Sequence, residues 1–195
     1  MSDKSTIETY DARAQDYAAL VDDVRMDGLD AFIAAMPEGA HILDLGCGPG
    51  NGAVHMAAAG HTVTAFDASA EMVALANRHP GVKAHQATFD EIEGKALYDG
   101  IWASFSLLHA PKADMPCHLA ALHRAAKPGA RLHLSVKVGE GEQTDTIGRF
   151  YSYYTQAELD GLIEAAGFRV AGHLTGAEEG LSGDMAEWVA VEAYA

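Results

Sequence analysis

Apolar and polar positions follow two alternating patterns along most of the chain. Short apolar runs bounded by glycine, such as "HILDL" at 41–45, are typical of buried strands in a parallel sheet. Stretches such as "AEMVALANRH" at 70–79, in which apolar residues recur every three or four positions, predict helices. The alternation of the two patterns predicts an α/β domain, with a sheet wrapped by helices on both faces.

The same patterns set approximate bounds for each element. Residues 3–36 are expected to be helical, and Pro37 and Gly39 end this region. Ser69 is a plausible N-cap, and Thr155 with Glu158 forms a capping-box pattern. Further helices are expected at 50–60, 70–79, 115–126 and 155–166. Strands are expected at 41–45, 61–67, 82–89, 98–106, 130–138, 169–175 and 187–195, with a polar, glycine-containing segment at 139–148.

Composition narrows the class of protein. The 195 residues suit one domain with a sizeable core, and the formal net charge of −15 argues against a nucleic-acid partner. Two cysteines, Cys47 and Cys117, make no disulfide framework and suit a reducing cytoplasm. The N-terminus does not resemble a secretory signal, and the uncharged run at 49–66, interrupted by polar residues, is a poor membrane span. The expectation is a soluble cytoplasmic protein, with an oligomeric state of monomer or homodimer left open.

The turn after the first strand, "DLGCGPGNG" at 44–52, contains more glycine than a structural connection needs. Glycines at 46, 48 and 50 let the backbone bend sharply and let a ligand approach its amides, and the following helix N-terminus favours an anionic group. Counted from Gly48, the dinucleotide fingerprint G-x-G-x-x-G ends at Ala53, which its relaxed form tolerates. Glycine spacing alone therefore leaves a nicotinamide cofactor open.

The second strand ends in Asp67, 23 positions beyond Asp44. A carboxylate at the end of this strand can accept hydrogen bonds from both hydroxyl groups of a ribose. The alternative is that Asp67 only caps the next helix. Nucleoside binding is the hypothesis that also accounts for the glycine-rich turn.

Taken together, "ILDLGCGPGNGA", "VTAFDAS" and "YDGIWASFSLLHAP" resemble the class I S-adenosylmethionine-dependent methyltransferases. The later segments "LHRAAKPGARLHLSV" and "YTQAELDGLIEAAGF" agree in order and spacing, so the resemblance covers roughly residues 5–195. It implies a Rossmann-like, seven-stranded, mostly parallel sheet with an antiparallel last strand. It also implies a single methyltransferase domain made of a helical cap (1–38), a cofactor-binding core (39–138) and a substrate-side half (139–195). Among these enzymes the chain is similar to small bacterial ones that methylate low-molecular-weight substrates.

The resemblance assigns S-adenosyl-L-methionine as cofactor. The Gly46–Gly50 turn would cradle its methionine end, Asp44 would attract the ammonium, and Asp67 would bind the ribose. Met72 would pack against the adenine, with ordinary core packing as the alternative. The implied cofactor set is Tyr10, Asp44, Gly46, Cys47, Gly48, Gly50, Asp67, Ala68, Met72, Thr88, Phe89, Ser104, Phe105 and Leu108.

Methyl transfer needs a base only when the acceptor must lose a proton of high pKa. The candidates are His109, Tyr153 and Tyr154; a structural role for His109, and packing at the sheet edge for the tyrosines, are the alternatives. By resemblance the N-terminal segment folds over the cofactor. The segment 137–149 either recognises the acceptor, with Lys137 and Arg149 as possible anion partners, or is a solvated connection.

The function predicted from these observations is transfer of a methyl group to a small molecule by in-line displacement. One rival is a non-catalytic module that binds S-adenosylmethionine, and a second is an NAD-dependent oxidoreductase. No metal site is predicted, because Cys117, His118 and His123 do not share a helix face. The identity of the acceptor and of the methylated atom is not legible in the sequence.

Overall fold

The computed structural model describes residues 3–21 and 26–195. The predicted N-terminal helical region contains three helices: α1 (Lys4–Ala12), α2 (Ala14–Val21) and α3 (Leu29–Ala34). Residues 22–25 of that prediction lie outside the described residues.

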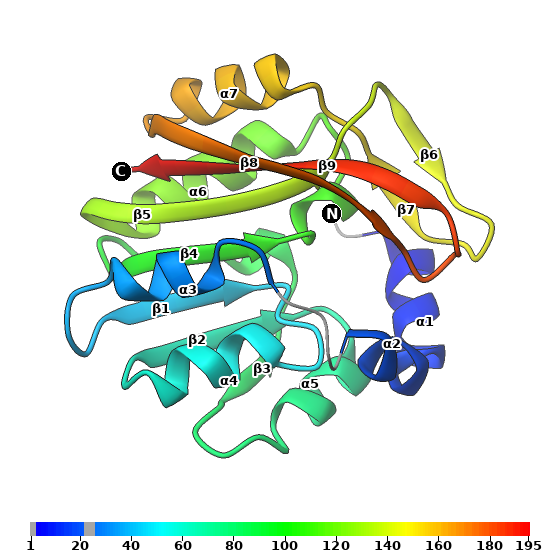
Figure 1. Ribbon diagram of the computed structural model, residues 1–195, viewed down its shortest axis with the longest axis horizontal. Helices are drawn as coiled ribbons and strands as arrows, with labels where there is room; N and C mark the ends of the chain where they lie inside the picture. Colours follow the sequence, from blue (N-terminus) through cyan, green and yellow to red (C-terminus); the bar gives the residue numbers. More distant parts are fainter. Residues whose placement is uncertain (1–2, 22–25) are drawn as a thin grey trace.

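A seven-stranded sheet forms the centre of the molecule (Figure 1). Its order is β3 (Ala84–Gln86), β2 (Thr62–Asp67), β1 (His41–Leu45), β4 (Tyr98–Ser104), β5 (Ala126–Lys137), β9 (Met185–Tyr194) and β8 (Arg169–Glu179). The pairs from β3 to β5 are parallel, whereas β9 is antiparallel to both β5 and β8. The predicted mostly parallel sheet with an antiparallel last strand is therefore confirmed.

Strand β4 is shorter than the predicted 98–106. It ends at Ser104 because Phe105 adopts φ +50°, a left-handed conformation that a strand cannot contain. The amide of Phe105 donates both to the hydroxyl of Ser135 on β5, at 2.9 Å, and to the carbonyl oxygen of the same residue, at 3.2 Å. These bonds fix the start of the turn that carries Phe105 out of the sheet.

The segment 139–148 is more ordered than predicted. Strand β6 (Glu142–Thr144) lies within it and pairs antiparallel with β7 (Phe150–Ser152) in a separate two-stranded sheet. Figure 1 shows this hairpin, α1 and α2 gathered at the end of the main sheet toward which β1 and β4 point. A second layer of chain therefore covers the carboxyl ends of the parallel strands.

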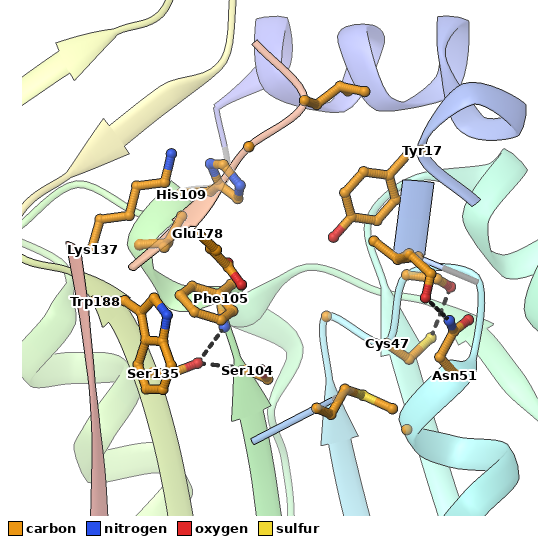
Figure 2. A pocket seen from close by; sticks show the side chains of 18 of the residues that line it. Tyr17, Cys47, Asn51, Ser104, Phe105, His109, Ser135, Lys137, Glu178 and Trp188 are labelled. Carbon is orange, nitrogen blue, oxygen red and sulfur yellow. Dashed lines mark hydrogen bonds between the residues drawn. The ribbon is translucent and has the colours of Figure 1, made fainter. Parts of the chain in front are cut away.

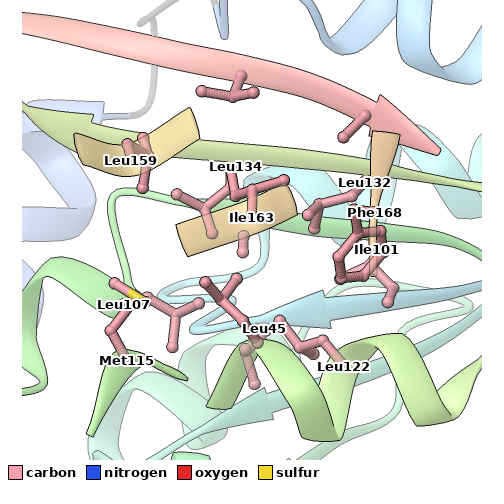
Figure 3. Packing of buried hydrophobic residues seen from close by; sticks show 14 of the residues in the cluster. Leu45, Ile101, Leu107, Met115, Leu122, Leu132, Leu134, Leu159, Ile163 and Phe168 are labelled. Atoms are coloured by element: carbon pink, nitrogen blue, oxygen red, sulfur yellow. The ribbon is translucent and has the colours of Figure 1, made fainter. Parts of the chain in front are cut away.

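Alternation along β1 divides the core into two layers. Leu43 and Leu45 belong to a cluster with residues of α6 (Met115–Ala125) and α7 (Gln156–Ala165), part of which is shown in Figure 3. Ile42 belongs to a cluster with residues of α3 and α4 (Asn51–Ala58). Within the described residues, no helix has the length and hydropathy that a membrane span requires.

The predicted helix caps are largely present. The Ser69 hydroxyl accepts the amide of Met72 at 3.1 Å and starts α5 (Ala70–Ala76). Thr155 likewise accepts the amide of Glu158, but the Glu158 carboxylate binds Lys112 and does not complete a capping box. A complete capping box occurs at Thr88, before the 3₁₀ turn η1 (Phe89–Glu91).

Candidate active site

The glycine-rich turn folds tightly against the neighbouring strands. Gly46 has φ +72°, and a Cβ built on it would lie 2.3 Å from the Cβ of Ser106. The amides of Gly46 and Cys47 both donate to the carbonyl of Phe66 at the end of β2, at 2.8 and 2.9 Å. Glycine at 46 is therefore required by a close approach as well as by its backbone conformation.

Asp67 links the glycine turn after β1 to the turn after β2 through hydrogen bonds. Its Oδ2 accepts the amide of Gly48 at 2.8 Å, and its Oδ1 accepts the amide of Ser69 at 2.9 Å. Burial raises the pKa of Asp67 to about 6, against the opposing effect of these two amides. A carboxylate has about four acceptor positions, so two remain for further donors. The helix itself is capped by Ser69, which leaves Asp67 available to a ligand.

Asp44 is only 3% exposed, and its Oδ2 has no hydrogen-bond partner among the described residues. Burial, followed by the charge of Asp67, raises the pKa of Asp44 to about 7. Gly52 lets the helix backbone approach this carboxyl group, because a Cβ there would lie 3.3 Å from Oδ2. A buried carboxyl oxygen without a donor, at the edge of a cavity, fits the ammonium group of a ligand.

Two adjoining cavities meet at the ends of the parallel strands. The larger one, about 390 Å³, lies over β1, β4 and β5, and the smaller one lies beside Asp67 and α5. Both are lined by the glycine turn, by Phe105 and by two tyrosines of the N-terminal helices, Tyr10 and Tyr17. The smaller cavity lies where a nucleoside bound to Asp67 would be expected, and the larger one continues from it.

Most of the predicted cofactor residues line these cavities. Those that do are Tyr10, Asp44, Gly46, Cys47, Gly48, Asp67, Ala68, Met72, Phe89, Ser104, Phe105 and Leu108. Gly50 and Thr88 line neither. Gly50 is the left-handed N-cap of α4 and packs against Ala76, so its glycine serves helix packing. Thr88 is occupied by its capping box with Glu91.

Two of the three predicted bases do not face either cavity. Tyr154 is fully buried in the larger core cluster, its hydroxyl has no hydrogen-bond partner among described residues, and burial raises its pKa to about 12. Tyr153 packs against Gly139. Tyr151, on β7, lines the larger cavity instead. The sequence "RFYSYYT" contains all three tyrosines, but only Tyr151 belongs to β7, and the other two follow its end.

His109 lines both cavities, and each of its two ring nitrogens makes a hydrogen bond. Its Nδ1 lies 2.6 Å from the carbonyl oxygen of Phe150, which can only accept, so Nδ1 carries the proton. Its Nε2, 3.0 Å from the Tyr10 hydroxyl, therefore accepts from Tyr10. Burial lowers the pKa of His109 to about 4, so the ring is neutral at pH 7. Arg149 also donates to the Tyr10 hydroxyl, at 3.3 Å.

The cavity wall opposite the glycine turn comes from the second half of the chain. Figure 2 shows Trp188, Ser135 and Lys137 on one side and Tyr17, Cys47 and Asn51 on the other. The sequence indicates Lys137 only as an anion partner, and most of this wall was not predicted. The residues of this wall come from four strands, β4, β5, β8 and β9, and follow no common sequence motif: Trp102, His133, Ser135, Glu178 and Trp188.

Known proteins resemble the chain in sequence and in fold. Residues 42–129 match the family profile described as "Methyltransferase domain". A ubiquinone/menaquinone biosynthesis C-methyltransferase of Rubrivivax gelatinosus is 37% identical over 102 residues, covering 51% of this chain and 40% of that protein. A malonyl-[acyl-carrier protein] O-methyltransferase of Erwinia billingiae is 33% identical over 109 residues, covering 54% and 42%. The chain spans about half the length, or less, of the curated relatives it matches.

Among solved structures, 1,6-didemethyltoxoflavin-N1-methyltransferase of Burkholderia thailandensis, with its substrate and S-adenosylhomocysteine bound, has the same fold. The TM-score is 0.77 at 23% identity, over 97% of this chain and 87% of that one. The [4+2]-cyclase SpnF also shares the fold, with a TM-score of 0.75 at 17% identity over 99% and 97% of the two chains.

The sheet order, the glycine turn and the sequence matches agree with a Rossmann-like, S-adenosylmethionine-dependent methyltransferase domain, and residues 42–129 carry the match to the family profile.

Proposed function

We propose that this protein transfers a methyl group from S-adenosylmethionine to a small-molecule acceptor. The observation that carries the proposal is the pair of carboxylates at the ends of β1 and β2, on either side of the glycine turn. Asp67 retains two acceptor positions for ribose hydroxyls, and Asp44 offers a buried oxygen that lacks a donor. A nucleoside that also bears an ammonium group matches both.

The arrangement of the two cavities supports methyl transfer in particular. S-adenosylmethionine supplies a methyl group already activated by its sulfonium, so the protein mainly has to hold the acceptor in line with it. Ser104 and Phe105, at the end of β4, line both cavities. A cofactor that spans the glycine turn would direct its sulfonium toward this shared boundary, and an acceptor in the larger cavity would lie beyond it.

His109 is the one predicted base that remains a candidate. Its neutral Nε2 accepts the Tyr10 hydroxyl, so a proton removed from an acceptor can reach His109 through Tyr10. The low pKa of His109 makes it a weak base, which suits an acceptor that is already anionic or easily deprotonated.

Charge and topology favour this function over its rivals. The net charge of −15 disfavours a nucleic-acid acceptor. An NAD-dependent oxidoreductase would be expected to continue with a second parallel nucleotide-binding half. In this protein β9 lies between β5 and β8 and is antiparallel to both, and this topology favours the methyltransferase over the oxidoreductase.

Ligand-induced stabilisation and product release together test the proposal. S-adenosylhomocysteine, which should bind only the native state, is expected to raise the melting temperature more than NAD does. A panel of small acceptors, assayed for release of S-adenosylhomocysteine, is expected to include at least one that is turned over. A larger shift with NAD would contradict the proposal, and binding without turnover of any acceptor would favour the non-catalytic module.

A further inference from the structure

We infer that the acceptor is a planar aromatic anion, with its negatively charged oxygen against the ammonium of Lys137 and its ring against the wall formed by Phe105 and Trp188. The inference rests on the proposed function, because it names the class of molecule that the larger cavity accepts. It depends on three features of the cavity wall: a cation that forms no ion pair with a carboxylate of the described residues, an aromatic wall made of Phe105 and Trp188, and the position of this wall next to the boundary between the two cavities.

The first feature is the difference between the two cations that line the larger cavity. Arg149 is neutralised by Asp145, whose Oδ2 lies 2.9 Å from Nε and 2.8 Å from Nη2. Lys137, at the end of β5, has no carboxylate within ion-pair distance among the described residues, and its Nζ lies 4.2 Å from the ring centroid of Tyr151. The charge of Arg149 is thus used in an ion pair within its own hairpin, whereas the charge of Lys137 is available to a ligand.

The surroundings of Lys137 make an anionic partner favourable. The residue is half-buried, and burial together with the charge of Arg149 lowers its pKa, while Asp145, Glu178 and Asp184 oppose that effect from a distance. A partly desolvated ammonium gains more from a direct anionic partner than a fully hydrated one does. Of these carboxylates only Glu178 lines the cavity, and it is exposed at the rim.

The second feature is a rigid aromatic wall. Trp188 pairs with Lys137 across β5 and β9, so the two side chains start from neighbouring positions. Its indole lies directly over Gly176 of β8, where an added Cβ would approach to 2.4 Å. The ring of Phe105 meets that of Trp188 edge-on, with centroids 6.0 Å apart. Such a wall favours a flat ring over a branched aliphatic group.

The third feature is the position of this wall relative to the cofactor. Phe105 lines both cavities, and its left-handed backbone is held by Ser135. Strain of this kind is stable only when the surroundings impose it, and it is concentrated at functional sites. A ring packed against Phe105 therefore lies next to the boundary across which a methyl group would move. Figure 2 shows Lys137, Trp188 and Phe105 on the same side of the cavity.

Matched pairs of probe ligands test the inference without knowledge of the natural acceptor. The full-length protein is first titrated with S-adenosylhomocysteine, and the binary complex is then titrated calorimetrically with benzoate, salicylate and 4-hydroxybenzoate, each beside its uncharged amide. At least one anion is expected to bind tenfold or more tightly than its amide. Lys137→Met is expected to abolish that preference, and Lys137→Arg to restore part of it. Lys83→Met, a change to an exposed lysine at the opposite end of the strands, is expected to leave it unchanged.

The outcomes separate this inference from the function on which it rests. No binding of S-adenosylhomocysteine would overturn the proposed function. Normal binding of S-adenosylhomocysteine, with no anion preferred over its amide, would overturn the inference alone. Glu178→Gln provides a second check that does not change Lys137: the variant is expected to bind the anion a few-fold more tightly. If benzylamine bound better than benzoate and lost affinity in Glu178→Gln, the acceptor would be a cation and the inference would be wrong.

Discussion

The two halves of the sheet build their parts of the cavity in different ways. In the parallel half, β1 to β4, each important group lies at the end of its own strand or in the turn that follows: Asp44 and Gly46 after β1, Asp67 after β2, Phe105 after β4. In the other half, the wall combines β5, β7, β8 and β9 with helix α1. In the first half each group therefore lies close to a strand end that the local sequence marks, whereas in the second half the groups come from elements that are distant in the sequence.

This difference implies different responses to mutation. The docking of α1 on the hairpin depends on single side-chain bonds: the Phe150 amide donates to the Thr6 hydroxyl at 2.8 Å, and the Thr9 hydroxyl donates to the Ile147 carbonyl at 3.1 Å. Each such bond contributes roughly 1 kcal/mol. Changes in the parallel half should therefore remove cofactor binding or folding, whereas changes in the second half should produce graded effects.

The largest effect is expected for Gly46→Ala. The new Cβ would collide with Ser106 and occupy a left-handed conformation, so the free energy of unfolding should fall by about 3 kcal/mol. Gly39→Ala is the matched control, because Gly39 is also left-handed, at φ +65°, but its Cβ would meet nothing within 4 Å. Its cost should be about 1 kcal/mol. Urea denaturation measures both, and equal losses would show that the close approach to Ser106 is unimportant.

Asp67→Ala should affect ligand binding more than folding. Two ribose hydroxyls would lose their acceptor, which corresponds to about 1–3 kcal/mol, or roughly tenfold to a hundredfold in affinity. We expect the stabilisation by S-adenosylhomocysteine in a thermal melt to be nearly abolished. Glu164→Ala, an exposed change on α7, is the control and should retain the full shift. A full shift in Asp67→Ala would remove this carboxylate from the binding site.

Asp44→Asn should change the pH dependence of stability. The folded-state pKa of Asp44, about 7, lies above its ordinary value of 3.8, so the folded state retains a proton that the unfolded state releases. The wild type should therefore lose stability as pH rises from about 4 through 7. The Asn variant should show a smaller loss, because only Asp67 among these two carboxylates still contributes to it, and should be more stable than wild type at pH 8 by about 1–2 kcal/mol.

Asp99→Asn is the control, because the pKa of Asp99 is shifted in the opposite direction from that of Asp44. The Lys127 ammonium and the His41 amide lower the pKa of Asp99 despite its partial burial, so its stabilising contribution is present above pH 4 and is lost as pH falls. Asp99→Asn should therefore be less stable than wild type at pH 8. Melting temperatures at pH 5 and pH 8 measure both variants, and parallel curves for wild type and Asp44→Asn would contradict the raised pKa.

The smallest effect is expected for Tyr10→Phe. The change removes the hydroxyl between Arg149 and the Nε2 of His109 and leaves His109 without a donor at that atom. A loss of about 1 kcal/mol in unfolding free energy is expected. Tyr17→Phe is matched, because among the described residues the Tyr17 hydroxyl makes no hydrogen bond, and it should cost less. Denaturation curves that rank the two variants in reverse would show that the Tyr10 contact does not hold the helix in place.

The contrast between the halves also explains what the sequence could predict. The parallel half was predictable because a strand, a glycine turn and a helix are adjacent in the chain, so local residue types determine the geometry. Asp67 and the capping hydroxyl of Ser69 were found in this way. Gly50 and Thr88 were assigned to the cofactor by resemblance, and in the structure they lie at helix N-termini and line neither cavity.

The second half was less predictable for a physical reason. Tyr151 lines the cavity from β7, which pairs with β6 in a segment whose sequence predicted no strand. Tyr154 follows β7 and is buried in the core. Trp188 lines the cavity because its indole lies over Gly176, a contact between strands that no local pattern reveals.

A crystal structure of the complex with S-adenosylhomocysteine tests the central claim most directly. We expect both ribose hydroxyls of the ligand to lie within hydrogen-bond distance of the Asp67 carboxylate. We also expect its amino group to lie near Asp44 and its sulfur to lie beside Phe105. A nucleoside bound elsewhere, or an Asp67 carboxylate turned away from the sugar, would contradict this claim.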